Sequence, residues 1–324
     1  GQYISYNGGV ESIPAIDNLF YTKSYIFNAG PAQHVGVMGI THLNDWINIY
    51  SGVDSGTNTS IGWPGDNNSA GAVQGGVELD LANYGLKIAA FTHAGPENPK
   101  QLDPYNVGWP NTPLECGCNP NSAMRYYNNL TITFTASEKW KFITDIAYYR
   151  DEGWNTFSTS GLSQNQIEFY DGNFGTNFVD FPAKARGVKA YGIAQYISYK
   201  ADDILWLNLR AEFWRDANNF FTATFPSNFS NANALHGFPS NIISQPIFPN
   251  NPSTGTSYFE ATIGAYLRPK IEGLRGYKDI ILRPEIRIDR ALNHTAPFIG
   301  SNTEWGRTSQ FTVNMDAILP FSIK

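Results

Sequence analysis

The stretch KDIILRPEIRIDRA, residues 278–291, alternates apolar and charged side chains over most of its length. Successive side chains of a β-strand point to opposite faces, so this pattern predicts a strand with one apolar and one charged face. In a soluble sandwich the apolar face packs into a core, whereas in a membrane barrel it contacts lipid and the charges face a lumen. Within the stretch, Pro284 lacks a backbone donor, which predicts a local bulge.

The same two-residue period recurs along the whole chain. DILWLNLRAEFW (203–214), MRYYNNLTITFT (124–135) and QFTVNMDAILPF (310–321) each carry one mainly apolar row and one more polar row. The pattern predicts about twelve strands of roughly 10 to 14 residues. They are expected near 1–6, 34–42, 44–53, 70–81, 84–94, 122–136, 138–151, 186–200, 202–215, 257–269, 277–289 and 309–323.

The connections between these segments alternate in length. Short turns are expected at 42–45, 81–85, 136–139, 200–203 and 269–276. Long polar connections are expected at 7–33, 54–69, 95–121, 152–185, 216–256 and 290–308. Transmembrane barrels have short turns at one rim and long loops at the other, and a tilted strand needs roughly nine to eleven residues to cross a bilayer. We therefore predict an all-β chain, an antiparallel up-and-down transmembrane β-barrel that forms one domain over 1–324.

Composition agrees with this fold and excludes several classes of function. Charged residues make up 15% of the chain, aromatic residues make up 15%, and the net charge is −6. The acidic balance argues against nucleic acid as a partner. No Gly-rich phosphate loop or hydrolase motif is present, and the five His residues are scattered, so we predict no catalytic residues, no metal and no cofactor. Cys116 and Cys118 are either an incidental loop pair or a deliberate loop clamp.

Three stretches resemble a known family. GGVESIPAIDNLFYTKSYIFNAGPAQHVGV (8–37), HLNDWINIYSGV (42–53) and the C-terminal LRPEIRIDRALNHTAPF…SQFTVNMDAILPF (282–321) are similar to the OmpL-like beta-barrel porin-2 family of bacterial outer-membrane proteins. The resemblance implies a pore in the outer membrane of a Gram-negative bacterium. It also implies a longer N-terminus, so two arrangements stay open: a complete barrel of about twelve strands, or the later part of one nearer sixteen.

The charged rows supply candidate pore residues of mixed sign, which would create a transverse field across a lumen. The candidates are Arg125, Lys141, Asp145, Arg210, Glu212, Glu260, Arg268, Arg283, Glu285, Arg287 and Asp316. For each, the alternative is a solvated structural pair without influence on transport. The connection 7–33 is expected to fold inward as a constriction loop, with Glu11, Asp17 and Lys23 as its charges; the alternative is an ordinary external loop.

The function that this pattern favours is passive diffusion of small hydrophilic solutes or ions. Two alternatives stay open: an enzyme of lipase or protease type built on an outer-membrane barrel, and a secreted β-rich carbohydrate-binding protein. The expected partners are outer-membrane lipid, lipopolysaccharide and the solutes themselves. A homotrimer is common among porins, although no residue in this sequence requires one.

Overall fold

A computed structural model provides the fold of this chain. It describes residues 1–59, 61, 70–97, 124–152, 188–217, 221–222, 255–269, 280–293, 295–299 and 305–320. Cys116 and Cys118, whose redox state the sequence left open, lie outside the described residues. No helix in the described part of the chain is long and apolar enough to cross a membrane.

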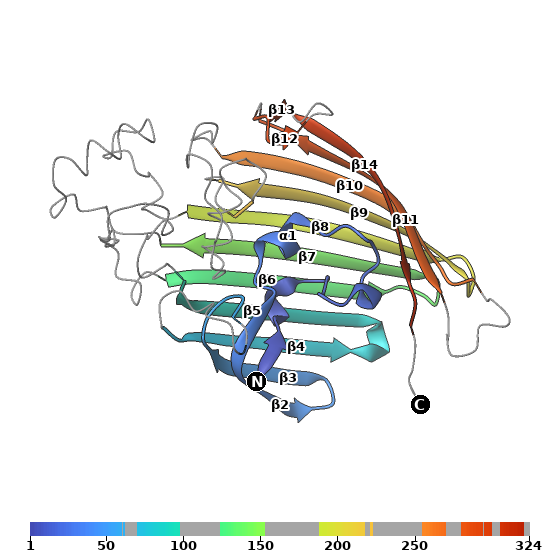
Figure 1. Cartoon of the computed structure of the whole chain (residues 1–324). Helices are drawn as coiled ribbons and strands as arrows, with labels where there is room; N and C mark the ends of the chain where they lie inside the picture. The colour runs from blue at the N-terminus through green and yellow to red at the C-terminus, as the bar shows by residue number, and fades with distance from the viewer. Residues whose placement is uncertain are drawn as a thin grey trace, which may run out of the picture.

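Twelve antiparallel strands form one curved sheet in which almost every strand pairs with its neighbours in sequence (Figure 1). The order is β1 to β11 followed by β14. The strands are β1 (Gln2–Ile4), β2 (Gln33–Asn44), β3 (Ile47–Asp54), β4 (Ala72–Leu81), β5 (Leu86–Pro96), β6 (Met124–Thr135), β7 (Trp140–Asp151), β8 (Val188–Lys200), β9 (Leu205–Asp216), β10 (Thr256–Leu267), β11 (Ile281–Ala291) and β14 (Ser309–Ile318). Among the described residues, β1 and β14 are the two edges, and they do not pair with each other.

The predicted strands are confirmed to within a few residues, and so is the alternation of short and long connections. Local side chains fix two of the short turns. In one turn Asp202 Oδ1 accepts hydrogen bonds from the backbone N–H groups of Ile204 and Leu205, at 2.8 and 2.9 Å. In another, Ser137 Oγ accepts from Lys139 and Trp140. Such side chains replace backbone partners in tight turns, which is why these polar residues end the strands.

Several small elements were not predicted. They are the helix α1 (Tyr25–Ala29), the single turns η1 (Tyr6–Gly8), η2 (Ala15–Asp17) and η3 (Ala82–Tyr84), and a separate two-stranded sheet of β12 (Phe298–Ile299) and β13 (Trp305–Arg307). Most of them are too short to give a periodic signal. The expected strand at 1–6 is reduced to the three residues of β1.

The prediction of a bulge at Pro284 is wrong. Pro284 pairs with Met315 of β14, and the register with β14 runs without a shift through all of β11. On the other side, β10 and β11 keep one register from Gly264 to Leu267, although no pair forms opposite Pro284 itself. The missing proline N–H therefore removes local pairing with β10 and leaves the alternation of faces intact.

The two faces of the sheet have the polarity expected of a barrel in a membrane. Ile263 and Val313 on the outer face each expose 66% of their surface. On the inner face Arg125, Arg210 and Glu260 are fully buried. A soluble protein would place these groups the other way round, since charged side chains are rarely buried and large apolar patches are rarely exposed.

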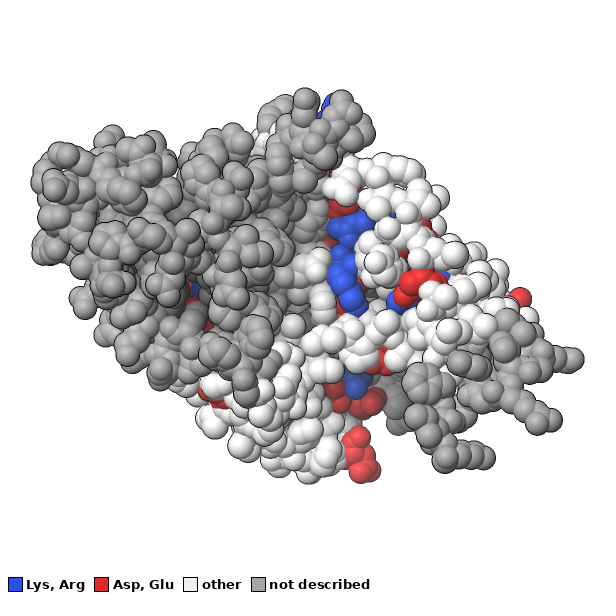
Figure 2. All heavy atoms as spheres, viewed as in Figure 1, with Lys and Arg blue, Asp and Glu red and all other residues white. Residues whose placement is uncertain are grey.

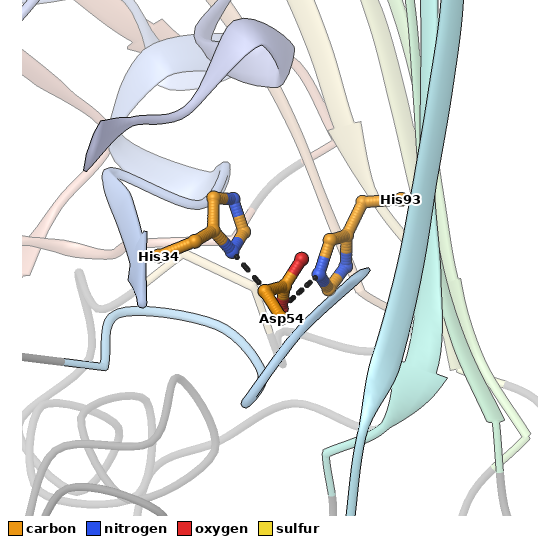
Figure 3. Close-up of side chains that lie close together, drawn as sticks. All are labelled: His34, Asp54 and His93. Carbon is orange, nitrogen blue, oxygen red and sulfur yellow. Dashed lines mark hydrogen bonds and ion pairs between the residues drawn. The ribbon is translucent and has the colours of Figure 1, made fainter. Parts of the chain in front are cut away.

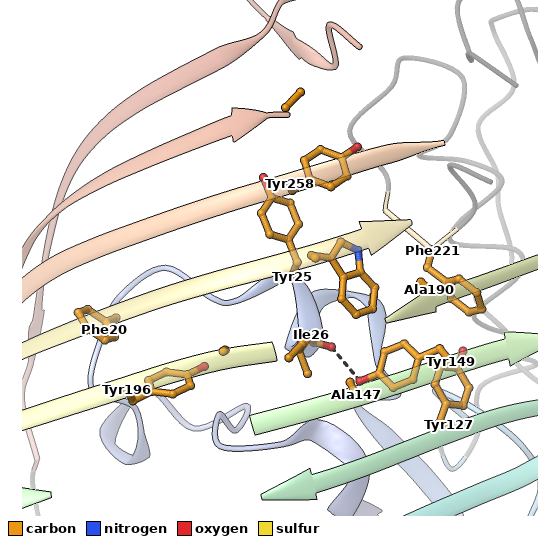
Figure 4. Close-up of a cluster of buried hydrophobic side chains, with 14 of the residues drawn as sticks. Phe20, Tyr25, Ile26, Tyr127, Ala147, Tyr149, Ala190, Tyr196, Phe221 and Tyr258 are labelled. Carbon is orange, nitrogen blue, oxygen red and sulfur yellow. Dashed lines mark hydrogen bonds between the residues drawn. The ribbon is translucent and has the colours of Figure 1, made fainter. Parts of the chain in front are cut away.

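Aromatic side chains share the inner face with the charges. Tyr127, Tyr149, Trp214 and Tyr258 are fully buried, and Figure 4 shows the aromatic rings of this cluster around Ile26. Trp214 is on the same alternating row of β9 as Arg210 and Glu212, and it is buried with them on the inner face. The rings fill the space between the sheet and the chain segment that crosses it.

Candidate functional site

Residues 5–32, which connect β1 to β2, lie across the inner face of the sheet (Figure 1). Side chains within the segment give it its shape. Ser24 Oγ accepts from the N–H of Phe27 and begins α1. Asn18 accepts from Ser12 N at 2.8 Å and donates to the carbonyl oxygens of Ser12 and Pro14, which closes the turn that contains η2. We call residues 5–32 the inward segment.

Arg210 of β9 is the centre of the contact between the inward segment and the sheet. Its Nη1 lies 2.7 Å from Glu11 Oε1, and its Nε lies 3.0 Å from Glu260 Oε2 on β10. Nη1 also donates to the carbonyl oxygen of Thr22 at 2.9 Å. Phe20 covers the guanidinium at 5.1 Å from its ring centroid. One arginine therefore joins two carboxylates, one from the segment and one from the sheet.

Arg283 of β11 binds the backbone of the inward segment. Its Nη1 donates to the carbonyl oxygens of Ala15, Asn18 and Phe20 at 2.8, 2.7 and 2.9 Å. Its other side pairs with Asp316 of β14, where Nη2 and Oδ2 are 2.5 Å apart. The planar guanidinium has five N–H donors in a fixed fork, which suits a set of converging carbonyl oxygens.

Inner-row carboxylates bind N–H groups of the same segment. Glu285 accepts from Tyr21 and Thr22, at 2.9 and 3.1 Å. Glu212 accepts from the first two N–H groups of α1, those of Tyr25 and Ile26, at 2.7 and 2.9 Å. These donors have no partner inside a helix, so a carboxylate at this position stabilises α1.

Asp145 of β7 has the same role nearer the start of the segment. It accepts from Val10 N at 3.1 Å and from Asn129 Nδ2 at 2.6 Å. Asp145 therefore contacts the inward segment, and its influence on transport stays a prediction.

Arg287 and Asp289 complete the charged row of β11. Arg287 Nη1 donates to the carbonyl oxygen of Lys23 at 2.6 Å, and its Nε lies 2.8 Å from Asp289 Oδ2. The hydroxyl of Tyr25 donates to Asp289 Oδ1 at 2.9 Å. Burial and the Asp289 carboxylate raise the pKa of Tyr25 well above its usual value, so the phenol stays protonated and remains a donor. Asp289 is a contact that the candidate set had missed, although it belongs to the same alternating row.

Other predicted residues lie outside this cluster. Arg125 is buried and pairs with Asp151 across β6 and β7, at 2.7 Å. Lys141 and Arg268 are exposed, and neither forms an ion pair among the described residues; Arg268 lies over the rings of Trp206 and Tyr266.

The remaining two charges of the inward segment are more accessible than Glu11. Asp17 is exposed, with one long contact of 3.4 Å to Ser12 Oγ. Lys23 is partly buried and donates to the carbonyl oxygen of Ser12 at 2.7 Å. Burial lowers the pKa of Lys23 to about 8; the nearby Glu11 opposes this shift, while Arg283 and Arg210 add to it.

Figure 2 shows basic and acidic side chains side by side in one band on the face that the inward segment crosses. Seven of the predicted pore charges belong to the cluster on β9, β10, β11 and β14: Arg210, Glu212, Glu260, Arg283, Glu285, Arg287 and Asp316. Their signs alternate along β9 and along β11, whereas Glu212 and Glu260 lie directly opposite each other on β9 and β10. Each arginine has a carboxylate within 3.0 Å.

Comparison with known proteins shows which family the chain belongs to. The sequence profile of the family described as "Putative beta-barrel porin-2, OmpL-like" matches residues 1–321. No curated protein sequence matches the chain.

Two solved structures cover nearly the whole chain at low identity. The outer-membrane expressed OmpT of Vibrio cholerae aligns with a TM-score of 0.46 and 13% identity, over 97% of this chain and 73% of that one. The outer membrane channel DcaP of Acinetobacter baumannii aligns with a TM-score of 0.45 and 12% identity, over 98% and 70%. Since the family profile matches almost every residue, this chain is a bacterial outer-membrane β-barrel protein that belongs to the OmpL-like beta-barrel porin-2 family.

Proposed function

We propose that the chain forms a passive pore for small hydrophilic solutes or ions, and that the inward segment narrows its lumen. One observation carries this proposal: the charged inner rows bind the backbone of a segment that crosses the inner face, while the outer face is apolar. A segment held by a buried ion pair and by hydrogen bonds to buried charges keeps a fixed position, and a fixed constriction sets the size and charge of what passes.

The buried arginines give the pore little preference for anions. Arg210, Arg283 and Arg287 each face carboxylates at ion-pair distance, so their charges are largely balanced within the protein. Of the predicted charges, the accessible ones are left to act on solutes: Lys141 and Arg268 of the inner rows, and Asp17 and Lys23 of the inward segment. We propose these four, and not the buried cluster, as the charges that a permeating ion meets.

Single-channel recording in a planar bilayer tests the proposal. The folded, detergent-purified chain is expected to give stable current steps that scale with salt concentration, with a weak selectivity read from reversal potentials under a salt gradient. A barrel that inserts and remains silent would contradict the pore. No hydrolytic role is proposed, and contact with lipopolysaccharide and assembly into a homotrimer stay predictions.

Glu11→Gln tests whether the inward segment is the constriction. The substitution removes the charge that pairs with Arg210, and it weakens the bonds that Glu11 accepts from the N–H and hydroxyl of Ser24. We expect a higher mean conductance with more frequent flicker, because the segment loses a buried anchor. Asp17→Asn is the matched control, since it removes one exposed charge from the same segment without removing a buried anchor; it should shift the selectivity and leave the flicker unchanged. Equal conductance in Glu11→Gln and the unaltered chain would remove the segment from the permeation path.

A further inference from the structure

Two histidines and an aspartate meet on the inner face at the ends of β2, β3 and β5 that lie opposite the short turns (Figure 3). The side chains of His34, Asp54 and His93 are completely buried. The imidazole rings of the two histidines stack with centroids 4.6 Å apart. This cluster is separate from the Arg210 contacts, and none of its three residues is among the charges proposed above to meet a permeating ion.

The ligand atoms of the cluster have the spacing of a small metal site. His93 Nε2 lies 3.1 Å from Asp54 Oδ1, and His34 Nδ1 lies 3.5 Å from the same oxygen. All three residues offer atoms within 4.8 Å of one another. Zinc bonds of about 2.0 to 2.1 Å in a tetrahedron place the donor atoms about 3.3 Å apart. The cluster therefore needs only small shifts to enclose an ion.

Neighbouring groups orient two of these side chains. The other nitrogen of His34, Nε2, lies 3.0 Å from Ser5 Oγ. Gln74 Nε2 donates to Asp54 Oδ2 at 2.6 Å, and Gly56 N donates to Asp54 Oδ1 at 2.8 Å. Hydrogen bonds of this kind hold the ligands of metal sites in position. The carbonyl oxygen of Gly56, which is 3.1 Å from His34 Nδ1, is a further possible ligand atom for a metal beside the cluster.

The hydrogen bonding of this pocket is incomplete. His93 Nδ1 and Gln74 Oε1 are buried and have no hydrogen-bond partner among the described residues. Buried polar atoms without partners are few in proteins, and a bound ion or water is a common reason for them. The two unsatisfied atoms lie beside the cluster: Nδ1 is the second ring nitrogen of His93, whose Nε2 faces Asp54, and Gln74 orients Asp54. A water next to the ion would supply their partners.

We propose that His34, Asp54 and His93 bind one divalent transition-metal ion of the zinc type. Two imidazole nitrogens and one carboxylate suit zinc, whereas calcium and magnesium take oxygen ligands. The ion joins β2, β3 and β5 next to β1 and Ser5, where the inward segment begins. Its role is structural: it fixes the N-terminal end of the segment whose later part Arg210 and Arg283 hold.

Metal content after refolding tests this site in the full chain. The chain is refolded in detergent with zinc chloride, passed over a weak chelator and analysed for zinc by mass spectrometry. We expect about one zinc ion per chain, and a fall of about tenfold or more in His93→Gln. His42→Gln is the matched control, because His42 is an exposed histidine on β2 near a short turn. Equal zinc in the unaltered chain and His93→Gln would overturn the site in favour of a hydrogen-bonded cluster without metal.

A second measurement uses only the unaltered chain, so it does not depend on the folding of a variant. Cobalt chloride replaces zinc, and a tetrahedral cobalt site with nitrogen ligands gives intense visible absorption that zinc then displaces. A weak, octahedral spectrum with no response to zinc would also overturn the proposal. Neither readout involves conductance, so a failed metal site and a failed pore are distinguishable.

Discussion

The C-terminal strands β9 to β14 and the N-terminal strands β2 to β5 contact the same inward segment with different kinds of side chain. In the C-terminal half, Arg210, Arg283 and Glu285 bind charges and backbone groups of residues 11–22. In the N-terminal half, Tyr6 packs between Tyr50 and Phe91, with ring centroids 5.1 and 5.4 Å away.

The difference shows what each chemistry is suited to hold. The middle of the inward segment has irregular backbone, whose N–H and C=O groups need partners when they leave water. Inner-row guanidinium and carboxylate groups supply these partners in the C-terminal half. Where β1 already pairs with β2 through the backbone, the aromatic packing of Tyr6 adds to those backbone hydrogen bonds. The charged half is therefore the more sensitive to a single substitution.

The largest effect is expected from Arg210→Met. The change leaves Glu11 and Glu260 buried without their common counter-charge. Removing one partner of a buried ion pair costs about 3–5 kcal/mol of folding free energy. Urea unfolding of the barrel in lipid vesicles measures this loss. Arg290→Met, at an exposed position on the outer row of β11, is the matched control and should change stability by less than about 0.5 kcal/mol.

A substitution in the N-terminal half tests whether that half is less sensitive than the charged half. Phe91→Leu removes a ring that packs on Tyr6 and leaves no buried charge behind. We expect about 1 kcal/mol of destabilisation, several-fold less than Arg210→Met. If the two variants lose equal stability in the same urea assay, the charged half has no special importance for the fold.

A lysine on the outer face tests the polarity of the sheet, and its expected effect lies between those of Arg210→Met and Phe91→Leu. Ile263 lies near the middle of β10 and exposes 66% of its surface. Ile263→Lys should cost about 2–4 kcal/mol in a bilayer, and Leu267→Lys at the strand end about 0–1 kcal/mol. On the surface of a soluble protein both changes would stay within about 0.5 kcal/mol, and no dependence on depth would appear. Urea unfolding in vesicles again gives the measurement.

Most of the fold could be predicted because a two-residue period depends only on which face a side chain occupies. Strand β9 shows this, because Arg210 and Glu212 are buried on the inner face. The apolar row on the outer face consists of Leu205, Leu207, Leu209, Ala211 and Phe213. Pro284 marks the limit of such reasoning. The residue type indicated lost pairing, but whether the register shifts depends on β10 and β14, which hold it in place.

The sequence was enough to predict most residues of the candidate site, but not the groups that those residues bind. Alternation placed Arg283 on the inner row, yet nothing in the sequence near it indicates that Ala15, Asn18 and Phe20 would supply its acceptors. These contacts join residues more than two hundred positions apart. His34, Asp54 and His93 were missed for a related reason: each lies on a different strand, and only the register of β2, β3 and β5 brings them together.

The smallest effect is a change of selectivity with pH, and it depends on Lys23. Burial lowers the pKa of this amine to about 8, so it is charged at lower pH and mostly neutral about one unit above. Losing a positive charge from the inward segment should raise the permeability ratio of cations to anions as the pH rises through that pKa.

Reversal potentials under a salt gradient, recorded from about one pH unit below the pKa to one above, measure this shift. Lys23→Gln should be more cation-selective at the low end of that range and should lose the pH dependence. Lys141→Gln is the control, because Lys141 is an exposed lysine of the inner row outside the inward segment. It should lower anion preference by a similar small amount and keep the transition near the pKa of Lys23. A transition that survives in Lys23→Gln would assign the titration to another group and weaken the case that permeating ions pass beside the inward segment.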